Sequence, residues 1–167
     1  PLIALQLSAF PVTKDEIILH GIKVLDIYEE AESEEEEGGA QVDRRYWERR
    51  ASAAALQALD AVVALVNDHV GPARVTYNKG HVALGTTGRN FCWFHPPREA
   101  SHCHVRVRTS AEMREEQMRA FDDTSLYVRA FQRELITLKL ALRDIETHRE
   151  QLVSLLRACE ALSRGSD

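Results

Sequence analysis

A chain of 167 residues, 44% of them apolar and 28% charged, has the size and composition of one globular domain with a short appendage. No run approaches the roughly 18 apolar residues of a membrane span, and the opening Pro-Leu-Ile-Ala-Leu lacks the basic start of a signal peptide. The three cysteines, Cys92, Cys103 and Cys159, are too few for a secreted disulfide scaffold and favour a reducing cytoplasm.

The net charge of −5 combines two parts of opposite sign. Residues 1–43 carry two lysines against eleven acidic residues, a net charge of −9, whereas residues 44–167 carry nineteen basic and fifteen acidic residues, a net charge of +4. Arginine outnumbers lysine 17 to 2 in the second part, and the guanidinium group is preferred for planar contacts with anions. High genomic GC content would also raise the arginine content, so both explanations stay open.

Residues 1–28 are predicted to form a short β segment with turns after Pro11 and at His20-Gly21. A ribbon of this size cannot build a core by itself, so it has to pack on the main domain, on a partner or on a preceding part of a longer protein. The expected strands are Leu2–Phe10, Glu16–Leu19 and Gly21–Tyr28.

The segment Glu29–Asp43 is dense in glutamate and is predicted to be a flexible linker, because like charges repel one another and stay solvated. The alternative interpretation is an acidic mimic of nucleic acid that folds back on the basic domain.

Residues 44–163 are predicted to form one domain, followed by a tail at 164–167. Asp43 is the expected N-cap of a long helix that ends at about His69, before Gly71-Pro72. One apolar stripe supports this helix: Ala55, Leu59, Val62, Val63, Val66 and Val70.

Short strands of alternating or apolar residues follow the first helix. Thr109 and Glu112 form a capping-box pattern that predicts a short helix to about Ala120, between the fourth and fifth of these strands. The strands are expected at Arg74–Tyr77, His81–Leu84, Asn90–Phe94, His102–Arg108, Leu126–Phe131 and Leu135–Leu142.

The last element, Arg143–Ser163, is predicted to be a long amphipathic helix that ends before Gly165. Its apolar stripe fits a helix lying on the sheet, and three heptads of the same pattern fit a dimeric coiled coil. The stripe consists of Ile145, His148, Leu152, Leu155, Leu156, Cys159 and Leu162. The element order therefore predicts an α+β fold, a mostly antiparallel sheet flanked by a long N-terminal and a long C-terminal helix, with a small N-terminal β ribbon.

A group of cysteines and histidines is a candidate zinc site, because thiolate and imidazole are the usual zinc ligands. The spacing is poor, since neighbouring residues of a strand point to opposite faces, although Cys92 and His95 could meet Cys103 or His104 across a hairpin. We therefore predict no metal and no cofactor. The group comprises Cys92, His95, His102, Cys103 and His104.

The strand His102–Arg108 has one apolar face and one face of histidine and arginine. Basic charge combined with an aromatic plane is the footprint of phosphate contacts plus base stacking, although an exposed strand face is often polar without any ligand. The predicted contacts with DNA or RNA are Lys79, Arg89, Trp93, Arg106 and Arg108.

No catalytic constellation is recognised, so the chain is not expected to be an enzyme. The serines lack a Gly-x-Ser-x-Gly elbow, and the turn Gly85-Thr86-Thr87-Gly88 leads into a strand instead of a phosphate-binding helix. Glu134 and Lys139 are five residues apart and therefore lie on opposite faces of a strand, unlike the Glu-x-Lys of a metal-dependent nuclease.

Four short motifs carry a resemblance to a known family. They are Tyr46-Trp47-Glu48-Arg49-Arg50-Ala51, Tyr77-Asn78-Lys79-Gly80-His81-Val82-Ala83-Leu84, Gly88-Arg89-Asn90-Phe91 with Phe94-His95-Pro96, and Ile145-Glu146-Thr147-His148-Arg149-Glu150. Through them the chain, from about Arg44 to Leu162, resembles uncharacterised bacterial domains sometimes labelled "predicted transport protein". The transport label has no support in a sequence without a membrane segment, and the family has no established catalytic residues to carry over.

Domains of that family often lie at the C-terminal end of longer proteins whose front part looks like a PD-(D/E)XK-type nuclease or a restriction or defence protein. The resemblance therefore implies that residues 1–28 are the tail of such a preceding domain and that the acidic segment is the interdomain linker. Two functions are carried forward: a non-catalytic nucleic-acid-binding or sensing module, and a protein-interaction module that forms a homodimer through its last helix.

Overall fold

The computed structural model describes residues 2–11, 17–27, 42–132 and 134–165 and divides the chain into two compact units, one up to residue 40 and one from residue 41. In the first unit, β1 (Leu2–Pro11) pairs antiparallel with β2 (Ile17–Ile27). The sequence predicts a turn at His20-Gly21, but both residues pair in register with β1. β2 therefore continues through them. The predicted linker up to residue 41 and the last two residues of the predicted tail lie outside the described residues.

The second unit contains a six-stranded antiparallel sheet in the order β3-β4-β5-β6-β8-β7. The predicted α+β class with a mostly antiparallel sheet is confirmed, and every strand begins and ends within two residues of its predicted bounds. The strands are β3 (Arg74–Tyr77), β4 (Val82–Gly85), β5 (Cys92–His95), β6 (Cys103–Arg108), β7 (Tyr127–Phe131) and β8 (Leu135–Leu140).

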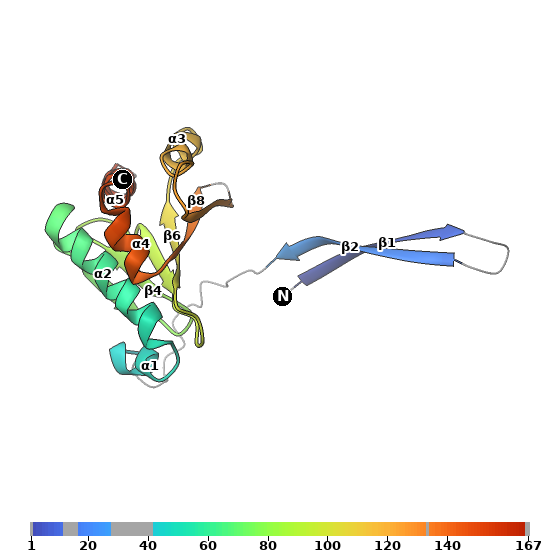
Figure 1. Ribbon diagram of the computed structural model, residues 1–167, viewed down its shortest axis with the longest axis horizontal. Helices are drawn as coiled ribbons and strands as arrows, with labels where there is room; N and C mark the ends of the chain where they lie inside the picture. The colour runs from blue at the N-terminus through green and yellow to red at the C-terminus, as the bar shows by residue number, and fades with distance from the viewer. Residues whose placement is uncertain (1, 12–16, 28–41, 133, 166–167) are drawn as a thin grey trace. The chain divides into compact units, whose positions relative to one another are not determined.

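Three helices lie together on one side of this sheet: α2 (Ala53–His69), α4 (Leu142–Thr147) and α5 (Arg149–Arg164) (Figure 1). Two shorter helices, α1 (Arg44–Glu48) and α3 (Arg114–Arg119), lie near opposite ends of the sheet (Figure 1). The core fills the space between the three helices and the sheet. No helix in the described part of the chain is long and apolar enough to cross a membrane.

The predicted first helix is broken into α1 and α2. Asp43 caps α1 as predicted, since its side chain accepts a hydrogen bond from the backbone N–H of Tyr46. Ser52 opens α2: its Oγ accepts from the N–H of Ala55 at 3.1 Å, while its own N–H donates to the carbonyl of Pro97 at 2.9 Å. The helix is therefore broken at Ser52 because its backbone N–H and its hydroxyl donate hydrogen bonds to carbonyl groups of the loop after β5.

The predicted last helix is also divided, at His148, into α4 and α5. Its apolar stripe lies in the core: Leu152, Leu155, Leu156 and Cys159 are at most 4% exposed. α5 contacts both α2 and β6, so the stripe covers the sheet, as one of the two interpretations of the sequence expects. A dimer through α5 would have to use the other face of this helix.

The predicted capping box at Thr109 and Glu112 is wrong. α3 begins only at Arg114, and the side chain that accepts at the preceding turn is Ser110, whose Oγ receives the N–H of Met113 at 3.2 Å. Thr109 is buried, and its hydroxyl donates to the side-chain oxygen of Gln117, so it ties α3 to the end of β6.

Candidate nucleic-acid interface

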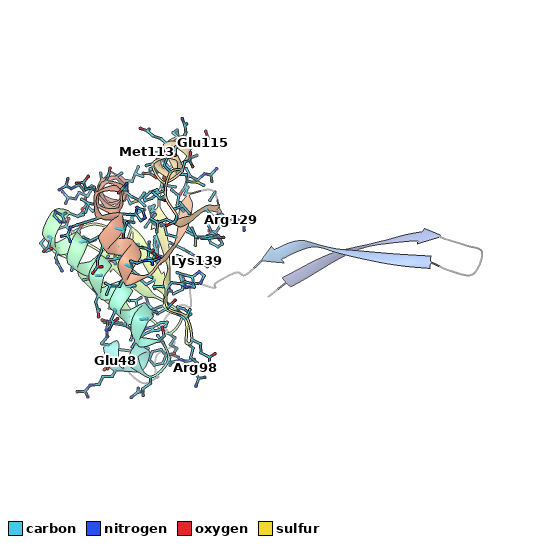
Figure 2. The ribbon with its side chains drawn as sticks, viewed as in Figure 1. Glu48, Arg98, Met113, Glu115, Arg129 and Lys139 are labelled. Atoms are coloured by element: carbon cyan, nitrogen blue, oxygen red, sulfur yellow. The ribbon has the colours of Figure 1, made fainter. Side chains whose placement is uncertain are left out.

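Side chains alternate between the two faces of the sheet along each strand, and every second one lies on the face that points away from α2, α4 and α5. Side chains of β5, β6 and β8 are alternately buried and half-buried, and residues paired across antiparallel strands share a face. Figure 2 shows Arg129 and Lys139 on this side, away from α2. We call it the open face; its members are Trp93, His95, His104, Arg106, Arg108, Tyr127, Arg129, Phe131, Leu135, Thr137 and Lys139.

The charge on the sheet is of one sign. The six strands of this sheet contain no aspartate or glutamate, while they hold the five basic residues Arg74, Arg106, Arg108, Arg129 and Lys139. The acidic residues of this unit lie in helices, turns and loops instead. Charges of one sign on one surface add to a positive potential that attracts polyanions.

Three basic side chains of the open face lie over aromatic rings of the same face. The guanidinium carbon of Arg106 lies 4.3 Å from the ring centroid of Phe131, and that of Arg108 lies 5.5 Å from the centroid of Trp93. The ammonium nitrogen of Lys139 lies 4.7 Å from the centroid of Tyr127. Such pairs are favourable because the face of an aromatic ring carries negative partial charge.

Four histidines gather at one end of the open face. His95 pairs with His104 across β5 and β6, the rings of His81 and His95 are 5.9 Å apart, and those of His102 and His104 are 5.0 Å apart. Burial, followed by the charges of His102, Lys139 and Arg106, lowers the pKa of His104. His104 is therefore neutral at pH 7, and its protonated form is disfavoured where positive charge is already dense.

The structure brings together three of the five predicted contact residues. Trp93 and Arg106 are direct partners across β5 and β6, and Arg108 reaches over Trp93. Lys79 and Arg89, in contrast, lie in the turns at opposite ends of β4, outside the strands that carry the other three residues.

Each of these two turns is held by contacts of its own. The carbonyl of Lys79 accepts a hydrogen bond from the hydroxyl of Tyr46 on α1 at 3.4 Å. At the other end, Thr86 donates to the buried carboxylate of Glu160 on α5 at 2.6 Å, and Arg74 donates to the carbonyl of Gly88 at 2.8 Å. Lys79 and Arg89 are exposed at the two ends of β4.

Sequence reasoning missed the contribution of β7 and β8. Tyr127, Arg129 and Phe131 alternate along β7, and Thr137 and Lys139 alternate along β8, which is the period-two signal of a strand face. The signal is visible in the sequence, but joining it to β6 requires the strand order β6-β8-β7. That order depends on tertiary packing, so the missing residues could not be assigned to the same face.

The cysteines and the histidines of the candidate zinc site do not come together. Cys92 and Cys103 are fully buried on the helix-covered face, whereas His95 and His104 belong to the open face. Burial raises the pKa of Cys103 to about 12, and zinc is bound by thiolate, not by thiol. Among the residues that the structure describes, no three potential ligands are close enough to hold a metal ion.

Comparisons of this chain with protein-family models, with curated proteins and with solved structures find no match. The chemistry of the open face is therefore the basis on which a function can be assigned.

Proposed function

We propose that the second unit is a non-catalytic nucleic-acid-binding or sensing module and that the open face is its contact surface. The observation that carries the proposal is the combination of a sheet without carboxylates and three cation–ring pairs on one face. Phosphates are bound by Arg and Lys with release of counterions, and aromatic rings bind bases, so both parts of this surface have a counterpart in nucleic acid.

The proposal extends to the setting of the module. The resemblance of residues 44–162 to domains found behind nuclease or defence proteins supports an accessory role in a bacterial protein of that kind. In this setting the segment up to residue 28 is a ribbon left by a preceding domain, the acidic residues that follow are the linker, and long first and last helices flank the sheet. The three free, buried cysteines support a reducing cytoplasm.

Homodimerisation without nucleic-acid binding is the alternative function. The burial of Leu152, Leu155 and Leu156 weighs against it, because the apolar stripe that a coiled coil would use already packs inside the domain. Sedimentation of the chain measures its oligomeric state, and titration with nucleic acid measures binding. A chain that sediments as a dimer and binds no nucleic acid at any salt concentration supports the alternative.

The proposed function is tested by titrating labelled single- and double-stranded DNA with the chain at about 50 mM and about 200 mM salt. We expect binding that weakens strongly at the higher salt concentration, because phosphate contacts release counterions. The double variant Arg106→Glu/Arg108→Glu is expected to abolish binding, since it places two carboxylates on a surface that has none.

The matched control is Arg119→Glu/Arg143→Glu, which makes the same change in net charge on α3 and α4, where both side chains are exposed. Thermal unfolding of each variant verifies that the fold is intact. Absence of binding by the unaltered chain at the lower salt concentration contradicts the proposal, and so does an equal loss of affinity in both double variants.

A further inference from the structure

The three cation–ring pairs of the open face form a track across the sheet. Trp93 lies on β5, Tyr127 and Phe131 lie on the edge strand β7, and β6 and β8 lie between them with Arg106, Arg108 and Lys139. Three steps between neighbouring strands span about 14 Å, since strands in a sheet are about 4.8 Å apart. The cations therefore lie between rings at the two sides of the track, over a distance that several nucleotides of an extended strand can cover.

The shape of this surface favours unpaired bases over a duplex. Sequence-independent contact with a single strand uses a basic surface along the backbone and rings on which the bases stack. Recognition of base pairs in a DNA duplex uses a secondary-structure element of the protein that enters a groove, most often an α-helix. Here α2, α4 and α5 lie on the other side of the sheet (Figure 1). The open face therefore presents strands whose side chains include aromatic rings.

The rings can exchange their present partners for bases. Tyr127 is 44% exposed on the edge strand, so a base reaches it without rearrangement of the core. A cation over an exposed ring contributes only about 2- to 5-fold to an equilibrium constant, whereas a stacked base contributes about 5-fold to over 100-fold. The displaced cation then contacts a phosphate, so the exchange is favourable for both groups.

Arg108 is poised for this exchange. Its Nε atom is buried and has no hydrogen-bond partner while the guanidinium lies over Trp93. An unsatisfied buried donor is unfavourable, and movement of the side chain toward a phosphate would satisfy it. The neighbouring hydroxyl of Thr137 is likewise buried without a partner, so the centre of the open face holds two polar groups with hydrogen bonds still to make.

We propose that the open face binds single-stranded nucleic acid, with bases stacked on Trp93, Tyr127 and Phe131 and phosphates bound by Arg106, Arg108 and Lys139. This inference rests on the proposed function and names its ligand class. The shared chemistry is a flexible phosphodiester strand with unpaired bases, so DNA and RNA are separate arms of the test. The carboxylates of an acidic peptide would pair with the cations, but such a peptide has no nucleobase that could stack on the rings.

The test compares four labelled probes of about 12 units, a length within the range that small single-strand-binding domains cover. They are a single-stranded DNA, an RNA of the same sequence, the blunt DNA duplex, and an abasic phosphodiester with the same number of phosphates. We expect the full chain to bind the DNA or RNA single strand at least about 10-fold more tightly than the abasic strand, because one stacked base already supplies that difference. Polyglutamate serves as the unlabelled acidic competitor.

Tyr127→Ala is the main variant, since this exposed edge residue can be removed without opening the core. We expect a loss of about 5-fold or more for the single strand and no change for the abasic strand. Tyr46→Ala is the matched control, because Tyr46 also forms a cation–ring pair but lies on α1, outside the sheet. The guanidinium carbon of Arg50 is 4.9 Å from the centroid of its ring. In a Trp47→Phe background, quenching of Trp93 fluorescence reports stacking directly.

The outcomes separate this inference from the proposed function. Equal affinity for the base-containing and abasic strands, or tighter binding of the duplex, overturns the inference while nucleic-acid binding stands. An equal loss in Tyr127→Ala and Tyr46→Ala also overturns it. Failure to bind any nucleic acid overturns both, and displacement by polyglutamate at equal phosphate and carboxylate concentration identifies an acidic polypeptide as the ligand instead.

Discussion

The basic residues of the open face lie close to one another. Their contacts with aromatic rings offset part of the repulsion between the like charges. Arg106 and Arg108 are two residues apart on one strand, and the guanidinium group of each lies over an aromatic ring. A cation–ring contact contributes only about 0.5–1 kcal/mol at an exposed site, less than the about 1.5–3 kcal/mol of a hydrogen bond to a charged group such as a phosphate. The cations therefore keep their capacity to bind an anion from outside.

His104 gives this surface a dependence on pH. Its pKa lies below the ordinary value of 6.5, through burial first and then the charges of His102, Lys139 and Arg106; His95 faces it from β5. In the unfolded chain the same imidazole takes up a proton as the pH falls through 6.5, while the folded protein resists it. Stability is therefore expected to fall as the pH drops below about 6.5.

The variant His104→Gln lacks this titration, so its free energy of unfolding should decline less between about pH 7.5 and about pH 5.5 than that of the unaltered chain. Urea unfolding at the two pH values measures the difference. His148→Gln, between α4 and α5, controls for the loss of an imidazole away from the open face. An identical decline in His104→Gln and in the unaltered chain would contradict the assignment.

At the scale of elements, the strands could be predicted and the helix breaks could not. Strand bounds follow from local signals, such as the alternation of Cys103, Val105 and Val107 and the glycines of the neighbouring turns. The break before α2 depends on Ser52, whose partners Pro97 and Ala100 are more than forty residues away in the chain. A local pattern of apolar residues continues through such a position without any sign of it.

Ser52 should therefore be important for stability despite its polar, partly buried side chain. Its hydroxyl caps α2 and donates to the carbonyl of Ala100 at 2.5 Å, so Ser52→Ala removes both interactions. We expect a loss of about 1–2 kcal/mol in the free energy of unfolding, measured by urea denaturation. Ser154→Ala, at an exposed position of α5, should change stability by no more than about 0.5 kcal/mol. Equal effects of the two substitutions would exclude a capping role for Ser52.

At the scale of the whole molecule, charge is distributed by element. The strands of the second unit hold basic residues without acidic ones, although residues 44–167 together have a net charge of only +4. Net charge alone therefore understates the potential of the open face, and the sequence could indicate only part of it. Trp93, Arg106 and Arg108 could be predicted from one strand and its neighbour, whereas Tyr127, Arg129 and Lys139 required the strand order.

The most direct test of the central claim is the salt dependence of single-stranded DNA binding. If Arg106, Arg108 and Lys139 each contact one phosphate, the plot of log K against log salt concentration has a slope of about −2, at about −0.7 per contact. Replacing the first two in Arg106→Gln/Arg108→Gln should reduce the slope to about −0.7, while Arg119→Gln/Arg143→Gln leaves it unchanged. An unchanged slope in Arg106→Gln/Arg108→Gln would show that nucleic acid does not bind the open face.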